Sequence, residues 1–383
     1  MLIQFTLKNF KLFKEETLLD FIPGPINEHK ASLIEDPLDK EQFLPVIAIH
    51  GPNGGGKSTV LHGLRYLASL ITDSPSPLSL FHPIHHRMSP ACADMPSEFD
   101  VLFRHRGFLF RYQLHLLRGT VTEENLFYGR LGGDAAGVLF GRKEDVFHLG
   151  KELPASPVGA LSQGELLLPR LAHASAGEIL QAAYSWFQEI RFLPASFSLP
   201  DGPDDPALIC SLLRHMDFDI TGYRLQTHGS GTAPQYFITH TPTDSPAFEL
   251  PLEDESQGTQ KLLSILPAIL STLRSGGLLL ADDLDSLLHP HLLRCINNIF
   301  SNREKNPHGS QLVFTSHNTA LMTPSDLRRD EMWLCSRPEG TDSRLYPLTW
   351  FKKENGLIPR NDEAYGKQYL EGRYGAIPRI SQP

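Results

Sequence analysis

Three aspartates follow one short apolar run in the last third of the chain. The run is Gly277–Ala281, and the acids behind it are Asp282, Asp283 and Asp285. An apolar run of this length predicts a buried strand. Carboxylates at the end of such a strand can bind a divalent cation or take a proton from water. A solvated acidic turn is the simpler interpretation. The choice between this turn and a functional site depends on other segments of the chain.

A glycine-rich loop near the N-terminus complements these acids. The segment GPNGGGKS, Gly51–Ser58, matches G-x-x-x-x-G-K-[ST], and the apolar run Val46–Ile49 precedes it. Strand, loop and helix in this order bind phosphate through backbone N–H groups and the helix N-terminus. No guanine-reading NKxD-like segment follows, which favours ATP. The residues expected to bind ATP here are Asn53, Gly54, Gly55, Gly56, Lys57, Ser58 and Thr59.

The loop and the acids predict a magnesium site. Lys57 would reach the β- and γ-phosphates, and the Ser58 hydroxyl would bind Mg²⁺. In phosphate-loop folds the strand beside the loop carries an acid into the Mg²⁺ shell. We therefore expect the strand before Asp282 to lie beside the loop strand, with Asp282 as a second Mg²⁺ ligand.

Two further segments have the composition of a nucleotide site. ESQGTQK, at Glu255–Lys261, opens a predicted helix with Ser256 and Gly258, and QLVFTSHN predicts a strand that ends near His317. The simpler interpretations are an ordinary capped helix start and a histidine without a role.

Two other segments contain residues that could contact a metal ion, one through a glutamine and one through histidines. LSQGEL, residues 161–166, looks like ESQGTQ but lies far upstream, and its Gln163 is a candidate contact to Mg²⁺ or the attacking water. The group His82, His85 and His86 has no carboxylate or thiol at ligand spacing, so we expect no metal there.

Strands alternating with helices at both ends of the chain predict a mostly parallel sheet assembled from its two extremities. We expect an α/β fold with an antiparallel β lobe and an inserted helical lobe. The predicted units are 1–71 with the phosphate loop, 72–150 with a Pro-rich loop and the β lobe, 151–220 as helical insertion, 221–350 with the acids, and a tail at 351–383.

Composition narrows the functional class. The formal net charge of −9 argues against a non-specific coat on nucleic acid. The four cysteines form no CxxC pair, and the N-terminus has neither an apolar signal region nor a cleavage site. No apolar run is long enough to span a bilayer. We expect a cytoplasmic protein in a reducing compartment.

With these motifs in order, the chain resembles ABC-type ATPases, including the Rad50/SMC/RecF heads. It is most similar to the AAA15 family, the RloA/AbiL-like proteins of prokaryotes. Beyond the motifs, the segments that carry the likeness are LIQFTLKNFKLFKEE, EFDVLFRHRGFLFRYQL, ENLFYGRL, FDITGY and KQYLEGRYGAIPRI.

The resemblance implies roles for several residues. Ser256 and Gly258 would touch the γ-phosphate held by the opposite subunit, and Asp285 would face that subunit. His317 takes the place of a histidine that touches the γ-phosphate. Asp283 stands where the family usually has the glutamate that polarises the attacking water. Its carboxylate is one methylene shorter, and a shift of about 1 Å can slow a reaction on the order of 10²-fold.

The resemblance also implies a homodimer with ATP at its interface and a role in anti-phage defence. The partner would be a separately encoded effector, often a TOPRIM-like or other nuclease, with a phage-derived trigger. Two other functions stay open. One is a non-hydrolysing scaffold locked by ATP, and the other is an ATPase that acts directly on DNA ends.

Overall fold

A six-stranded, mostly parallel sheet forms the centre of the molecule. The computed structural model describes residues 1–73, 84–133, 136–153, 161, 164–174, 177–193, 206–216, 218–226, 235–338, 341–352 and 356–378. The strand order is β11-β15-β16-β5-β17-β18, and β18 alone runs antiparallel to its neighbour. The strands are β5 (Val46–His50), β11 (Arg191–Phe192), β15 (Leu278–Ala281), β16 (Gln311–Ser316), β17 (Met332–Ser336) and β18 (Arg344–Pro347).

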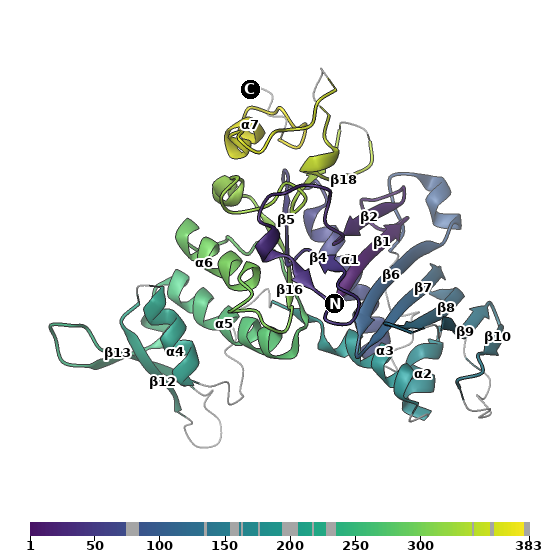
Figure 1. The fold of residues 1–383 in the computed structure, drawn as a ribbon, viewed down its shortest axis with the longest axis horizontal. Coiled ribbons are helices and arrows are strands. Elements are labelled where there is room, and N and C mark those ends of the chain that lie inside the picture. Colours follow the sequence, from purple (N-terminus) through teal and green to yellow (C-terminus); the bar gives the residue numbers. More distant parts are fainter. Residues whose placement is uncertain are drawn as a thin grey trace.

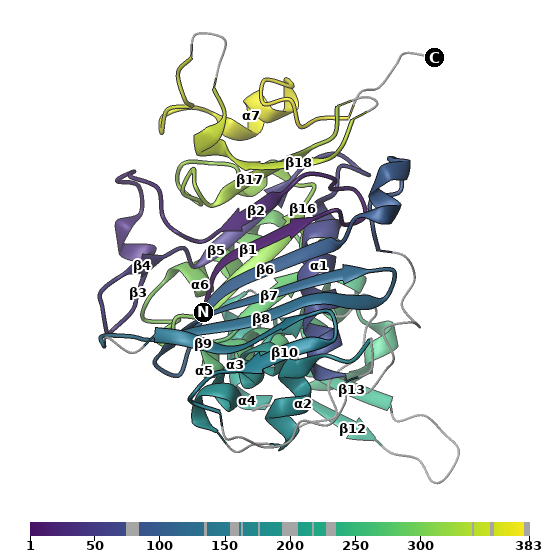
Figure 2. The same ribbon diagram turned by 90° about the vertical axis from the view of Figure 1, so that its right-hand side faces the viewer.

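A seven-stranded antiparallel sheet lies beside it, in the order β10-β9-β8-β7-β6-β1-β2 (Figure 2). Its strands are β1 (Leu2–Lys8), β2 (Thr17–Asp20), β6 (Ser97–His105), β7 (Phe108–Leu117), β8 (Thr120–Arg130), β9 (Ala136–Lys143) and β10 (Val146–Leu149). Arg106–Gly107 and Arg118–Gly119 connect three of them. All four residues have positive φ, which is the type I′ geometry that suits two-residue hairpins.

The first strand belongs to this antiparallel sheet. The strand β1, Leu2–Lys8, pairs antiparallel with both β2 and β6. Its alternating pattern leaves one face partly exposed, whereas β5 is buried along its whole length. Only the second kind of strand fits inside a parallel sheet covered on both faces.

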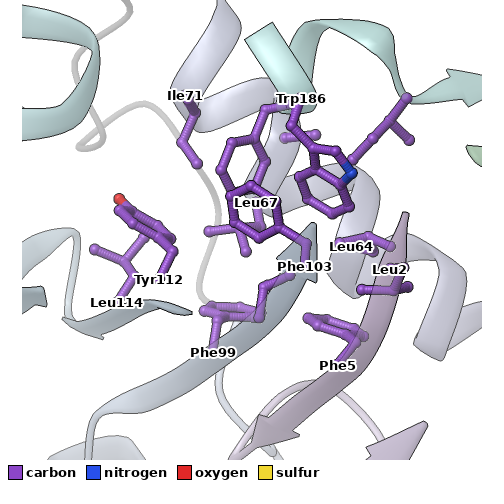
Figure 3. Packing of buried hydrophobic residues seen from close by; sticks show 14 of the residues in the cluster. Leu2, Phe5, Leu64, Leu67, Ile71, Phe99, Phe103, Tyr112, Leu114 and Trp186 are labelled. Carbon is purple, nitrogen blue, oxygen red and sulfur yellow. The ribbon is translucent and has the colours of Figure 1, made fainter. Parts of the chain in front are cut away.

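The helix α1 (Lys57–Thr72) packs between the two sheets. Figure 3 shows its Leu64 and Leu67 against Phe5 of β1 and Phe103 of β6, with Trp186 closing the far side. Trp186 belongs to α3 (Glu178–Glu189), and its ring stacks on Phe103 with centroids 4.1 Å apart. Together with α2 (Leu167–Ala174), α3 covers the antiparallel sheet rather than forming a lobe of its own.

The opposite face of the parallel sheet is covered by α5 (Gln257–Ser275) and α6 (Pro290–Ser301) (Figure 1). The C-terminal segment packs on the same core through α7 (Tyr365–Leu370), whose Tyr365 and Tyr369 are buried. Tyr346 also donates a hydrogen bond to the carbonyl of Tyr374 at 2.7 Å. The described part of the tail is therefore packed against the body.

A small sheet projects from this body (Figure 1). It consists of β12 (Ile220–Gln226), β13 (Gln235–His240) and β14 (Phe248–Pro251), with α4 (Pro206–His215) packed on it. A two-stranded ribbon of β3 (Ile34–Glu35) and β4 (Gln42–Phe43) completes the strands of the described residues. In the described ranges, no helix has the length and apolar content to cross a membrane.

The buried carboxyl of Glu331, next to β17, predicts a pH dependence of stability. Burial raises its pKa from 4.5 to about 8, with the charge of Asp330 adding to the effect. The folded state thus holds a proton that the unfolded state loses above pH 4.5, so stability falls as the pH rises from there to about 8. Glu331→Gln should remove this loss, on the order of a few kcal/mol. Urea unfolding of both proteins at pH 5 and pH 8.5 measures it. Equal pH dependence in the two would contradict the prediction.

Candidate functional site

The carboxyl ends of the parallel strands bring the predicted site residues to one edge. The loop after β5 and the turns after β15 and β16 leave the sheet there, because the three strands are parallel and in register. We expected β15, the strand before Asp282, to lie directly beside the loop strand β5. This expectation was wrong, because β16 lies between β15 and β5. Val313 of β16 pairs with Leu280 on one side and Ile47 on the other.

The phosphate loop is pressed against β17. A Cβ on Gly51 would lie 2.2 Å from the carbonyl oxygen of Cys335, so only glycine allows this approach. From the other side, the Cys335 thiol lies 3.0 Å from the carbonyl oxygen of Gly55. Gly54 and Gly56 have φ of 70° and 112°. The glycines therefore shape the loop, and its backbone is held by a strand outside the motif.

Lys57 is buried at the start of α1, with its ammonium group turned to the loop. It donates hydrogen bonds to the carbonyls of Gly51 at 2.9 Å and Pro52 at 3.2 Å. Burial lowers the pKa of Lys57, while the nearby charges of Asp283 and Asp282 oppose that effect. Asn53 and Gly54 are exposed, Ser58 is half-buried and Thr59 is buried. The charge of Lys57 therefore interacts with the charges of Asp282 and Asp283.

One threonine of the intervening strand orders the acid pair. The buried hydroxyl of Thr315 donates to Oδ1 of Asp282 at 2.6 Å and accepts from the backbone N–H of Asp283 at 2.7 Å. Asp283 itself adopts a left-handed backbone with φ of 47°. Thr315 was missed in the sequence; its signal is a hydroxyl residue at the end of the strand, two positions before His317.

His317 meets Asp283 at this edge. The ring Nε2 lies 3.6 Å from Oδ1 of Asp283, and both side chains are about half-exposed. The Asp285 carboxylate is used inside the chain, because its Oδ2 accepts from the backbone N–H groups of His317 and Asn318 at 3.1 and 2.9 Å. Asp285 thereby fixes the turn that carries His317.

Two further histidines line the site. His62 of α1 places Nε2 4.0 Å from Oδ2 of Asp282, and it was missed although it lies one helical turn after Ser58. His50, the last residue of β5, is buried; burial lowers its pKa to about 3, with the charges of Lys57 and His317 adding to the effect. His50 is therefore neutral beneath the loop, and its ring meets that of Tyr369 edge-on at 6.4 Å.

Ser256 and Gly258 lie at the exposed start of α5. Ser256 caps the helix by accepting from the N–H of Thr259 at 3.1 Å. A Cβ on Gly258 would lie 3.0 Å from the carbonyl oxygen of Leu287, which is itself 58% exposed with φ of 67°. Within the described residues, no hydrogen bond or ion pair joins Ser256 or Gly258 to the phosphate loop of the same chain.

The remaining metal candidates have different outcomes. Gln163 and His82 lie outside the described residues. His86 is buried, and its ring bridges the carbonyl of Lys11 and the carboxylate of Asp342, both at 3.0 Å. Across the described ranges, no group of three or more His, Cys, Asp or Glu is arranged to hold a metal ion. Mg²⁺ does not need one, since it usually takes one or two protein ligands beside phosphates and waters.

Comparisons with solved structures concern the fold. The chain is similar to the SMC head domain from Thermotoga maritima, with 15% identity, a TM-score of 0.43, and 91% of this chain and 98% of that one covered. It is also similar to an SmcHead bound to the C-winged helix domain of ScpA, with 13% identity, a TM-score of 0.45, and coverage of 91% and 97%. A third similar structure is a Smc head domain with an extended coiled coil bound to the C-terminal domain of ScpA, derived from Pyrococcus furiosus. Its identity is 11% and its TM-score 0.45, with 91% of this chain and 96% of that one covered. The predicted α/β class is confirmed by the mostly parallel central sheet, the helices packed on it and the separate antiparallel sheet.

No curated protein matches the chain. A sequence model of one protein family matches residues 46–323, which is more than half of the chain and runs from β5 past His317. It therefore includes the phosphate loop, the start of α5 and the acid turn. The chain belongs to this family, which is described as "AAA domain, putative AbiEii toxin, Type IV TA system".

Proposed function

We propose that the protein is an Mg²⁺-dependent ATPase that dimerises around ATP and controls a separate effector in anti-phage defence. The observation that carries the ATPase part is the meeting of Asp282, Asp283 and His317 at the sheet edge that holds the phosphate loop. A nucleotide-hydrolysing ATPase is also what the family and fold support in general.

The residues at this edge fit ATP and Mg²⁺. The half-buried Ser58 hydroxyl and the partly exposed Asp282 carboxylate would hold the ion, with phosphates and water as further ligands. When bound, Mg²⁺ supplies charge neutralisation at the phosphate oxygens. Thr315 keeps Asp282 in one orientation, so this ligand needs no rearrangement when the ion arrives.

Asp283 is the proposed general base. A base must lie within hydrogen-bond reach of the water that it deprotonates, and the half-exposed Asp283 side chain lies beside His317 at this sheet edge. His317 would orient the same water or a γ-phosphate oxygen. Lys57 would bind the β- and γ-phosphates through its ammonium group, which now donates to loop carbonyls.

The start of α5 supports the dimer. Ser256 and Gly258 are packed beside Leu287 in the turn that follows the acids, and the surface that they form is exposed and partly apolar. Free N–H groups at a helix start attract phosphate. A second copy of the chain could therefore offer these groups to the ATP held by the first.

The effector and the defence role rest on likeness. The AAA15-like segments and the family description, which names a toxin and a toxin–antitoxin system, support a cytoplasmic prokaryotic defence ATPase with a separately encoded partner such as a nuclease. The net charge of −9 counts against direct action on DNA.

A scaffold that binds ATP without hydrolysing it is the second candidate, and Asp283 favours it. A carboxylate one methylene shorter than that of glutamate would stand further from the attacking water. The left-handed backbone of Asp283, with φ of 47°, also changes the direction in which its side chain leaves the turn.

Steady-state ATP turnover separates these candidates. We expect the wild type to hydrolyse ATP slowly and Asp283→Asn to lose on the order of 10²-fold or more, because an amide cannot accept the proton. Asp283→Glu is the control that keeps a base. A silent wild type that still binds ATP, with activity restored by glutamate, would favour the scaffold.

A charged substitution tests the dimer. Ser256→Arg should block ATP-driven dimerisation, because it places a long cation where the partner's nucleotide would lie, while ATP binding to the monomer stays normal. Light scattering with and without MgATP measures dimerisation, and calorimetry measures ATP binding to the monomer. Gln257→Arg, next to it, is the matched control. An unchanged ATP-driven oligomer in Ser256→Arg would contradict the assignment.

Removal of the Thr315 hydroxyl should affect both folding and chemistry. Thr315→Val leaves the N–H of Asp283 unsatisfied, at a cost of about 1–3 kcal/mol. It also frees Asp282, so we expect turnover to fall about 10-fold or more and the required Mg²⁺ concentration to rise. Thr315→Ser keeps the hydroxyl and should therefore restore both the stability and the Mg²⁺-dependent turnover. A valine variant with normal Mg²⁺ dependence would show that the hydroxyl is only structural.

A further inference from the structure

A cleft of about 660 Å³ opens beside the phosphate loop, away from the aspartates. Ser343 lines the cleft and also adjoins the loop, because a Cβ on Gly56 would lie 3.0 Å from its hydroxyl oxygen. The remaining walls come from residues 14–18, the segment 86–89, and residues 341–345 with Trp350. No motif in the sequence pointed to this cleft.

The order of strands gives the direction of a bound nucleotide. The acids follow β15, which lies on one side of β5, whereas the cleft adjoins β18, on the other side beyond β17. A triphosphate whose terminal phosphates face Asp282 and Asp283 must extend its other end across the loop, away from the acids. That end is the nucleoside, and the cleft lies where it arrives.

We infer that this cleft is the nucleoside-binding part of the ATP site, with Trp350 stacking on the base and Ser343 hydrogen-bonding the ribose or base. The inference rests on the proposed ATPase function, because it assumes that the loop holds the phosphates.

Trp350 offers an aromatic surface. Its side chain is 56% exposed, whereas the neighbouring Trp333, with ring centroids 6.1 Å apart, is buried and supports it. An exposed aromatic face of this kind can stack on a planar ligand. Loss of such a ring typically weakens the binding of a stacked nucleobase about 10-fold or more.

Ser343 offers an unused hydrogen-bonding group. It is 5% exposed, and in the described part of the chain its hydroxyl has no hydrogen-bond partner. A buried hydroxyl without a partner is costly. A ribose hydroxyl or a base nitrogen entering the cleft would satisfy it, and its position next to Gly56 is close to the phosphates.

The cleft is built rigidly and has a mixed charge. His86 connects the carbonyl of Lys11 to Asp342, and the N–H of Ser343 donates to the carbonyl of Leu12 at 3.1 Å, which ties the walls together. The lining carries the basic Lys14 and Arg344 and the acidic Glu15, Glu16 and Asp342, of which Asp342 is paired with His86. A lining without an excess of basic side chains suits an uncharged base and sugar better than a further phosphate group.

Binding of two ligands to the full-length protein tests the inference. MgATP carries the nucleoside and inorganic tripolyphosphate does not. Trp350→Ala should weaken MgATP binding about 10-fold and leave tripolyphosphate binding unchanged, and Ser343→Ala should act in the same direction. Val146→Ala, at an exposed residue of β10 in the antiparallel sheet, is the control, and Lys57→Ala should lose both ligands.

The two proposals fail in different ways. If Trp350→Ala and Ser343→Ala bind MgATP as the wild type does while Lys57→Ala does not, the nucleoside assignment is wrong and the phosphate site stands. If the wild type binds neither ligand, both proposals are wrong.

Fluorescence gives an independent readout. Of the three tryptophans, Trp186 and Trp333 are buried, so a change of emission in solution reports mainly on Trp350. MgATP should quench the emission, tripolyphosphate should not, and Trp350→Phe should lose the quenching while retaining MgATP affinity. Quenching of equal size in Trp350→Phe would overturn the assignment.

Discussion

The acid turn depends on one buried hydroxyl. Thr315 stands on β16, the strand between the phosphate-loop strand and the acid strand, and reaches the side chain of Asp282 and the backbone of Asp283 at once. The contact to Asp282 is charge-assisted, because a hydroxyl donates to a carboxylate, and such hydrogen bonds are stronger than neutral ones. The strand that carries none of the acids therefore sets their geometry. The same strand ends in His317, so one element positions the acid pair and delivers its neighbour.

Much of this edge could be predicted from the sequence, because local patterns encode it. The loop motif, the apolar runs of β5 and β15 and the capped start of α5 are each local signals, and each forms the element expected of it. The order of strands could not be predicted, since pairing depends on contacts between distant segments. For the same reason the sequence pattern does not show that β1 joins the antiparallel sheet. The use of Asp285 to hold His317, and the Trp350 and Ser343 cleft, likewise depend on segments that meet only after folding.

The start of α5 is connected to the projecting sheet through one histidine. His240 of β13 hydrogen-bonds the carboxylates of Asp219 and Glu255, both at 2.6 Å, and Glu255 precedes Ser256 directly. Burial alone would lower the pKa of His240, but these two carboxylates outweigh it and raise the pKa. The bridge is therefore strongest when the ring is charged. Through it, a displacement of the small sheet would move Ser256 and Gly258, the groups that the proposed dimer would place on the partner's ATP.

The backbone gives a physical reason for an aspartate at position 283. The turn after β15 requires φ of 47° there, a left-handed conformation that aspartate adopts more readily than most residues other than glycine and asparagine. The N–H of this residue must also point to Thr315, which fixes the backbone further. Aspartate is thus favoured by the turn, although its carboxylate reaches less far than that of glutamate. His317 lies 3.6 Å from the Asp283 carboxylate, so the two side chains form one polar group at this edge. In the proposed ATPase, this pair rather than a single longer acid would hold the attacking water.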